Sequence, residues 1–162
     1  MRGGAMDWED RDDYIVWDKS LELGIPAIDA QHKKLVALCN SLNESLMNVK
    51  SGETKDWQEP FKEALQDAAN YVVTHFKSEE VLMKAAHYTS YEEHKHSHDV
   101  FTAKVLESVR TFNDASLSDA FQFVRFLYEW ILTHVAREDK FYVHQVMAYC
   151  RKVQQVQHAT KN

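Results

Sequence analysis

Apolar residues recur at alternating spacings of three and four positions along four stretches of the chain. Such spacing places them on one side of an α-helix, which would then face a protein core. Asp29, a favourable N-cap residue, marks the start of the first stretch, and Ser51-Gly52 marks its end. Pro60 suits the first turn of the second stretch. Helices are predicted at about residues 29–51, 57–86, 91–112 and 117–153.

The connections between these helices are short, and only four glycines and two prolines interrupt the chain. Both features favour an all-α fold in which residues 29–153 form an up-down-up-down antiparallel four-helix bundle. Residues 1–28 lack helical periodicity and are predicted to form an N-terminal arm. Its apolar residues from Tyr14 to Ile25 should pack on the core, and about the first ten residues should be disordered. Residues 154–162 are predicted to form a frayed C-terminal tail.

Polar residues interrupt the apolar stripes, and most of them are of types that bind metals. Each predicted helix contributes at least one, and the set comprises His32, His75, Glu79, His94, His98 and His134. A buried imidazole or carboxylate without a partner costs several kcal/mol, although a hydrogen bond can satisfy any one of them. A set that draws on every helix instead indicates one shared partner in the centre of the bundle.

A cluster of imidazoles and carboxylates suits a first-row transition metal. Five histidines, Glu79 and at least one acidic residue near His134 exceed what a single octahedral ion can hold beside an external ligand. Two ions bridged by carboxylates fit these residues better, because one anion can then serve both ions. Mixed imidazole and carboxylate ligands favour iron over manganese or zinc.

The three histidines of residues 94–98 do not share a face of their predicted helix. His94 and His98 are four residues apart and lie about 40° apart around the helix axis. His96 lies about 160° from their midpoint and should face solvent. No role is assigned to the histidines that lie off the stripes or in a loop or tail, which are His87, His144 and His158.

Four segments carry the candidate ligands in chain order: GIPAIDAQH, HFKSE, HKHSH followed by DVF, and WILTHVARED. An isolated HxxxE or HxxxH is a weak signal, but the ordered set, with one segment for each helix, is specific. It resembles the hemerythrin family, particularly its bacterial members, over about residues 14–143. One departure is the sequence His87-Tyr88-Thr89, where many relatives have Gly-Tyr-Pro, which should alter the turn between the second and third helices.

The resemblance implies a pair of iron ions bridged by two carboxylates and an oxo or hydroxo group. The residues implied for the first iron are His94, His98 and His134. Those implied for the second iron, which would keep an open coordination position for dioxygen, are His32 and His75. The implied bridging carboxylates are Glu79 and Asp139.

The second bridging carboxylate is where spacing and resemblance disagree. Asp139 lies about 140° from His134 on an ideal α-helix, so Glu138, at the i+4 position, is better placed by spacing alone. The HxxxxD pattern of the family points to Asp139, and a helical bulge would help to bring that residue toward the metals.

The implied function is reversible binding of dioxygen, held as a hydroperoxide, for carriage, storage or delivery. Trp130 and Ile131, one turn before His134, would line an apolar pocket beside the oxygen site, although core packing explains Trp130 equally well. One alternative is an oxygen or redox sensor domain that acts on an output domain or a partner protein. Another is a diiron peroxidase or oxidase, but the sequence defines no organic-substrate pocket, so a non-enzymatic role is predicted.

Charge and composition argue against several other classes. The formal net charge of −6 at pH 7 disfavours nucleic-acid binding, which requires a basic face. No apolar run approaches the roughly 20 residues of a membrane span, and the first residues do not resemble a secretory signal. A cytoplasmic protein is therefore predicted.

Cys39 and Cys150 are expected to be buried free thiols, with a disulfide between them as the alternative. The chain contains neither the HExxH motif of zinc hydrolases nor the paired Glu-x-x-His motifs of ferritin-like enzymes.

Overall fold

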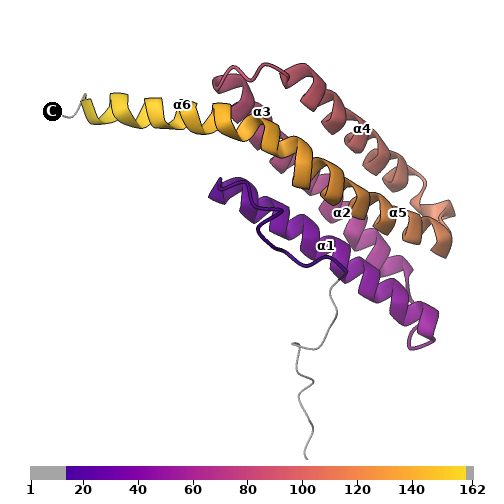
Figure 1. The fold of residues 1–162 in the computed structure, drawn as a ribbon. Coiled ribbons are helices and arrows are strands. Elements are labelled where there is room, and N and C mark those ends of the chain that lie inside the picture. Colours follow the sequence, from indigo (N-terminus) through magenta and orange to yellow (C-terminus); the bar gives the residue numbers. More distant parts are fainter. Residues whose placement is uncertain (1–13, 160–162) are drawn as a thin grey trace, which may run out of the picture.

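The computed structural model describes residues 14–159, and the regular structure of that part of the chain is entirely helical. The α-helices are α1 (Pro26–Ser51), α2 (Gln58–Tyr71), α3 (Lys77–Ala85), α4 (Tyr91–Arg110), α5 (Leu117–Trp130) and α6 (Asp139–Ala159). The other helical segments are π-helix η2 (Val72–Phe76), the short 3₁₀ helix η3 (Phe112–Asp114) and π-helix η4 (Ile131–Glu138). Because η2 joins α2 to α3 and η4 joins α5 to α6 without a loop, the helices form four rods. The predicted all-α four-helix bundle is confirmed (Figure 1).

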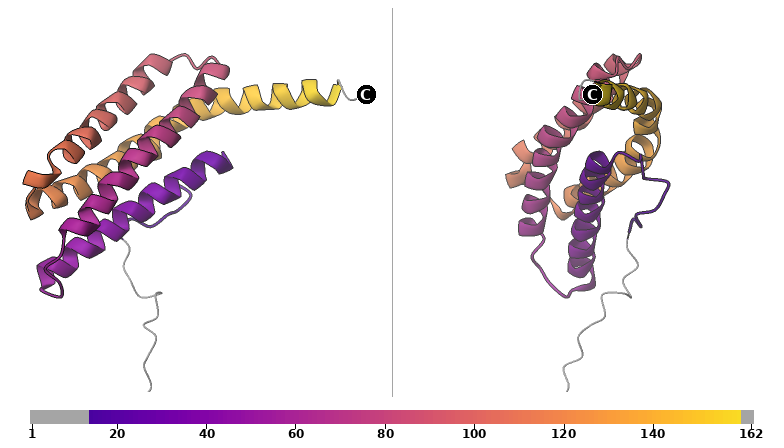
Figure 2. Two further views of the ribbon diagram at one scale, coloured as in Figure 1. Left: turned by 180° about the vertical axis from the view of Figure 1, so that it is seen from behind. Right: turned by 90° about the vertical axis from the view of Figure 1, so that its left-hand side faces the viewer.

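The four rods pack as a bundle whose neighbours are joined by short connections. Helix α1 packs against α2 and α5, while α2 also contacts α4. At the other end of the second rod, α3 contacts α4 and α6. The two views in Figure 2 show the rods side by side, with the C-terminal part of α6 extending beyond the other helices.

The first helix begins at Pro26, earlier than the predicted start at Asp29. Proline suits this first position because a helix does not use the N–H groups of its first turn. Asp29 is therefore not the N-cap. Its carboxylate accepts hydrogen bonds from the backbone N–H groups of Leu23 (2.8 Å) and Gly24 (3.0 Å), so it fixes the loop that leads into the helix. The predicted stop at Gly52 is correct, since this residue is the C-cap in the left-handed conformation (φ 85°).

Two further helix ends show how local residues set the boundaries. Ser116 and Asp119 form a capping box at the start of α5, in which each side chain binds the backbone N–H of the other residue. Between α3 and α4, His87 adopts a left-handed conformation (φ 54°) in the turn whose sequence departs from the family pattern. The last helix runs to Ala159, so residues 154–159 are helical where a frayed tail was predicted.

The buried apolar side chains form two clusters, and the buried polar residues lie between them along the rods. In the second rod, Glu79 separates Phe76 of the larger cluster from Met83 of the smaller one. In the fourth rod, Asp139 separates Val135 of the larger cluster from Tyr142 of the smaller one. The polar site therefore crosses the bundle at one level, with apolar packing above and below it.

The described part of the N-terminal arm packs on the bundle as predicted. Ile15, Leu21 and Leu23 are buried. The side chain of Asn40 fixes the arm with two 2.8 Å hydrogen bonds, since its Oδ1 accepts from the N–H of Ile15 and its Nδ2 donates to the carbonyl of the same residue. The predicted disorder of the first ten residues falls outside the described residues.

Both cysteines are free thiols, which excludes the disulfide alternative; Cys39 is buried and Cys150 is half-buried.

Among the described helices, none combines the length and the apolar character needed to cross a membrane.

Candidate metal centre

All seven predicted ligand residues are buried in the bundle interior, and each has 5% or less of its surface exposed. They come from every rod of the bundle, and the set comprises His32, His75, Glu79, His94, His98, His134 and Asp139. They are the buried polar or charged residues of the described chain. Two bands of apolar packing thus enclose a single layer of imidazoles and carboxylates.

The seven side chains form two overlapping groups, in each of which the ligand atoms lie within 4.8 Å of one another. One group contains Glu79, His94, His98, His134 and Asp139. The other contains His32, His75, Glu79 and Asp139. Glu79 and Asp139 belong to both groups, so the two carboxylates lie between three histidines on one side and two histidines on the other.

Asp139 directs one carboxylate oxygen toward each group. Its Oδ1 lies 2.9 Å from Nε2 of His134 and 3.3 Å from Nε2 of His94. Its Oδ2 lies 3.1 Å from Nε2 of His32, which belongs to the other group. A carboxylate in this position can bridge two ions.

Glu79 contacts both groups mainly through Oε2. This oxygen lies 3.1 Å from Nε2 of His98 and 3.3 Å from Nε2 of His75. The other oxygen, Oε1, lies 3.8 Å from Nε2 of His32 and accepts a 2.6 Å hydrogen bond from the hydroxyl of Tyr142. Tyr142 therefore holds the carboxylate from the side of the smaller apolar cluster.

Most of the atoms that face the centre have no hydrogen-bond partner of proper geometry among the described residues. These buried atoms are Oε2 of Glu79, both carboxylate oxygens of Asp139, and Nε2 of His94, His98 and His134. Leaving such groups unpaired costs about 1–3 kcal/mol each, and more for charged groups. Convergent donor atoms of this kind match the ligand chemistry of a transition metal, and their overlap in two groups matches a pair of ions.

The π-helix η4 explains how Asp139 reaches the centre despite its unfavourable spacing. The backbone N–H of Asp139 donates to the carbonyl of His134, five residues earlier, where an α-helix would join residues four apart. The wider turn brings both side chains to the same side of the rod. Glu138 is half-buried instead, and its Oε2 accepts a 2.8 Å hydrogen bond from Nδ1 of His134. Glu138 is thus a support for His134, and Asp139 is the acid inside the centre.

Other histidines also have a partner behind the ring, on the side away from the centre. Nδ1 of His75 donates to the side-chain oxygen of Gln31 over 2.8 Å, and Nδ1 of His98 lies 3.3 Å from Oε1 of Glu80. Such partners fix the ring orientation and the tautomer of a metal-binding histidine. The sequence reading missed these residues, although Gln31 and Glu80 are direct chain neighbours of predicted ligands.

Neighbouring histidines keep both central carboxylates ionised despite their burial. Burial acts to raise the pKa of Glu79, but His75, His94 and His98 hold that pKa well below its usual range. The pKa of Asp139 is likewise lowered, because His134 outweighs the effects of burial and of the nearby Glu79 charge. Two buried anionic groups therefore face the same centre, which favours a cation there.

The pKa values of two of the histidines shift in opposite directions. Burial lowers the pKa of His75. It acts on His134 in the same direction, but the Asp139 and Glu138 carboxylates outweigh it and raise the pKa of His134 to about 9. Without a metal, His134 would therefore be protonated at neutral pH beside Asp139.

Aromatic rings cover three of the histidines. Trp130 stacks on His134 with ring centroids 3.8 Å apart, and Phe76 stacks on His98 at 3.9 Å. Tyr71 stacks on His75 at 4.4 Å. Ile131, the other predicted pocket residue, is fully buried in the larger apolar cluster. These apolar groups limit the access of water to this side of the centre.

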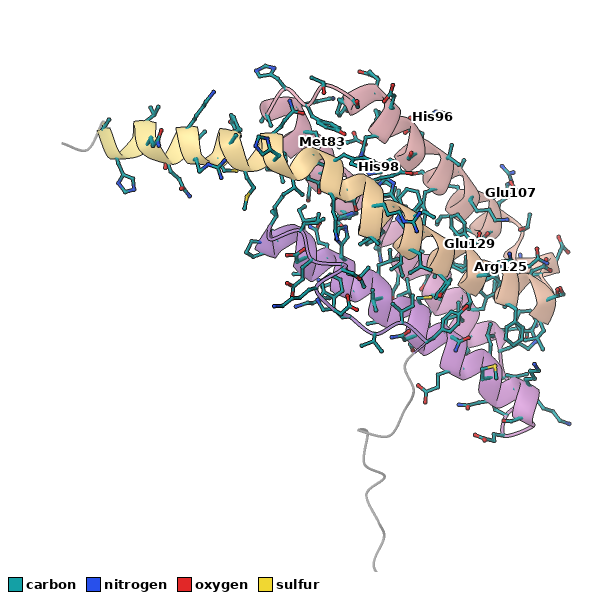
Figure 3. All side chains as sticks on the ribbon, viewed as in Figure 1. Met83, His96, His98, Glu107, Arg125 and Glu129 are labelled. Carbon is teal, nitrogen blue, oxygen red and sulfur yellow. The ribbon has the colours of Figure 1, made fainter. Side chains whose placement is uncertain are left out.

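The histidines that received no role are all exposed, and they are His87, His96, His144 and His158. Figure 3 labels His96 and His98 on α4, and His96 lies on the outer side of the helix. His98 points into the bundle, as the predicted spacing requires.

Comparison with known proteins agrees with this geometry. Residues 23–145 match the family model described as the hemerythrin HHE cation binding domain. The chain is 29% identical to a bacteriohemerythrin of Stenotrophomonas maltophilia over 136 residues, which cover 83% of each protein. It is also 29% identical to a hemerythrin-like protein of Naegleria gruberi over 126 residues, which cover 78% of this chain and 88% of that protein. A crystal structure of a hemerythrin mutant superposes with a TM-score of 0.69 at 24% identity, over 83% of this chain and 98% of that one. The chain therefore belongs to the hemerythrin HHE cation-binding family.

Proposed function

We propose that this chain binds two iron ions and uses them to bind dioxygen reversibly. The observation that carries the proposal is the unequal division of donors around two shared carboxylates. Five residues surround one position and four surround the other. The first position has enough protein ligands to be closed. The second, between His32 and His75, would keep a coordination position for one small external ligand.

The choice of iron rests on the donor set and on the family. Imidazole and carboxylate ligands together suit iron, and the absence of cysteine from the layer argues against sites that select softer metals. A pair of ferrous ions would supply the two electrons needed for reduction of bound dioxygen.

The protein's own residues would hold and protect the pair. Gln31, Glu80 and Glu138 orient three of the histidines from behind, and Tyr142 orients Glu79. The proposed pocket residues, Trp130 and Ile131, would keep bulk water from the side that the aromatic rings cover. Nothing in this arrangement provides a second set of polar groups to orient an organic substrate, so we favour dioxygen binding over peroxidase or oxidase activity.

A sensing role is the second candidate, and one contact favours it. Lys140, the residue after Asp139, donates a hydrogen bond from Nζ to the backbone carbonyl of Ser20 in the N-terminal arm. A change at the metal pair that moved Asp139 would act directly on this contact. Hydrogen exchange of residues 14–25, compared between the oxygen-free and oxygen-bound forms, separates the candidates, because a carrier should show no change in the arm.

The test of the proposed function is a cycle of oxygen exposure. Protein loaded anaerobically with ferrous iron should develop a visible absorption band in air and lose it under argon, over repeated cycles and without loss of iron. An irreversible change at the first exposure, or no change at all, would contradict reversible dioxygen binding.

A further inference from the structure

Tyr71 is a buried polar residue beside the candidate centre that the proposed ligand set does not use. It is the last residue of α2 and lies one turn before His75, on whose ring it stacks (centroids 4.4 Å apart, interplanar angle 21°). Only 7% of the residue is exposed, and its hydroxyl oxygen is buried. Tyr71 thus lies at the end of the centre formed by His32 and His75, where the smaller number of protein ligands would leave a coordination position open in the proposed iron pair.

The Tyr71 hydroxyl lacks a hydrogen-bond partner among the described residues. One polar neighbour is Nε1 of Trp130, which influences the hydroxyl but forms no hydrogen bond of ordinary geometry with it. An indole N–H can only donate, so Trp130 could not accept the hydroxyl proton of Tyr71 in any orientation. A phenol carries its proton at neutral pH, so the Tyr71 hydroxyl is available as a donor.

The two central carboxylates do not take this proton either. Glu79 accepts its tyrosine hydrogen bond from Tyr142, and neither carboxylate accepts one from Tyr71. A buried hydroxyl without an acceptor is unfavourable. Phenylalanine would give the same ring stacking without this cost. What Tyr71 lacks is therefore an acceptor for its hydroxyl proton, and the described residues do not supply one.

Tyr71 also separates the centre from a surface groove. A cavity of about 770 Å³ lies between α1 and α2, and its lining includes Gln31, Leu35, Tyr71 and Thr74. Tyr71 is one of the residues that line this groove, but its hydroxyl oxygen is buried. The hydroxyl therefore belongs to the interior side, where Trp130 and the carboxylates lie, and surface water in the groove does not satisfy it.

We propose that Tyr71 donates a hydrogen bond to the small external ligand that binds beside His32 and His75. The inference rests on the proposed diiron function and adds a positioning residue to it. A donor at this place stabilises a ligand that carries negative charge, such as azide or reduced dioxygen, more than a neutral one.

The test compares azide binding to the oxidised, iron-loaded protein with binding to the variants Tyr71→Phe and Tyr88→Phe. Tyr88 is a matched control, because its ring lies 6.4 Å from that of His94 but its hydroxyl is near Ser90, toward the surface. We expect the azide dissociation constant to increase about tenfold in Tyr71→Phe, the loss expected for one hydrogen bond to an anion, and to stay unchanged in Tyr88→Phe.

A second measurement excludes a merely structural effect of the substitution. The azide stretching frequency should shift between H₂O and D₂O in the wild-type protein and not in Tyr71→Phe. The melting temperature of the azide-free protein should not fall in this variant, because the hydroxyl it lacks has no protein partner.

The possible failures are distinguishable. Equal azide affinity and equal isotope response in wild type and Tyr71→Phe, with two iron ions in each, would overturn the role of Tyr71 and leave the proposed function intact. A wild-type protein that does not take up iron would overturn the proposed function itself.

Discussion

Asp139 donates its backbone N–H to the carbonyl of His134, five residues earlier, and its side chain lies 2.9 Å from the imidazole of the same residue. An α-helix would place these side chains about 140° apart. The π-helix therefore gives the fourth rod two inward-facing candidate ligands where regular geometry gives one. It also leaves Glu138 outside the centre, as the partner of the other nitrogen of His134.

The different positions of the two neighbouring acids predict different effects of neutralising them. Asp139→Asn should abolish binding of a second iron ion, because the residue contacts histidines of both groups. Glu138→Gln should keep both ions but weaken iron affinity by about 10- to 100-fold, the effect of losing an outer partner of a ligand. Iron content and competition with a chelator measure the two effects. Equal losses of iron in the two variants would contradict the placement of Asp139 inside the centre and Glu138 outside it.

Single histidines at the two ends of the centre should each be essential for a full complement of iron. His75→Ala and His134→Ala each remove a buried ligand, and we expect iron content to fall by at least half in both. His96→Ala is the matched control, since this histidine lies on the outer face of α4 and should not change iron content or the visible spectrum. Elemental analysis after gel filtration checks all three, and a loss of iron in His96→Ala would be inconsistent with the geometry.

The hydrogen bond from Tyr142 to Glu79 should stabilise the fold even before metal binds. Both residues are fully buried, and the acceptor is charged. Tyr142→Phe should lower the free energy of unfolding of the metal-free protein by about 1.5–3 kcal/mol. Tyr149→Phe, at an exposed position of the same helix, should change it by less than about 0.5 kcal/mol. Urea denaturation of the two variants gives the comparison, and similar values for both would show that the buried bond contributes nothing.

The two thiols should differ in reactivity. Burial raises the pKa of Cys39 to about 12, so the fraction of reactive thiolate at pH 8 is very small and the side chain is out of reach. Cys150 is half-buried in the middle of α6, against the smaller apolar cluster. A thiol reagent at pH 8 should modify Cys150 in the folded protein and both cysteines in urea. Rapid modification of Cys150→Ala without denaturant would show that the core around Cys39 opens readily.

Much of the fold and the inward direction of the candidate ligands could be predicted from the sequence. The period of apolar residues places the four rods, and the same period places His94 and His98 inward and His96 outward. In a regular helix, the spacing of residues along the chain is sufficient to predict which way their side chains face. The predicted ends of the helices were less accurate. Helix α1 begins at Pro26, before the predicted start, and the helical residues 154–159 lack a strong apolar pattern.

The details that spacing could not supply depend on backbone irregularity and on how the rods meet. Nothing in the residues 131–138 themselves specifies a π-helix, so the position of Asp139 needed the family pattern. The contact between Gln31 and His75 joins α1 to the second rod and depends on their packing. The same holds for Tyr142 and Glu79, which are 63 residues apart in the chain.

The most direct test of the diiron centre is an anomalous difference map, recorded at the iron absorption edge from crystals of the iron-loaded protein. We predict two peaks in the polar layer of the bundle, both in contact with Glu79 and Asp139. The first should be surrounded by the imidazoles of α4 and η4, and the second should lie between His32 and His75. A single peak in the polar layer, or no peak there, would contradict a diiron centre.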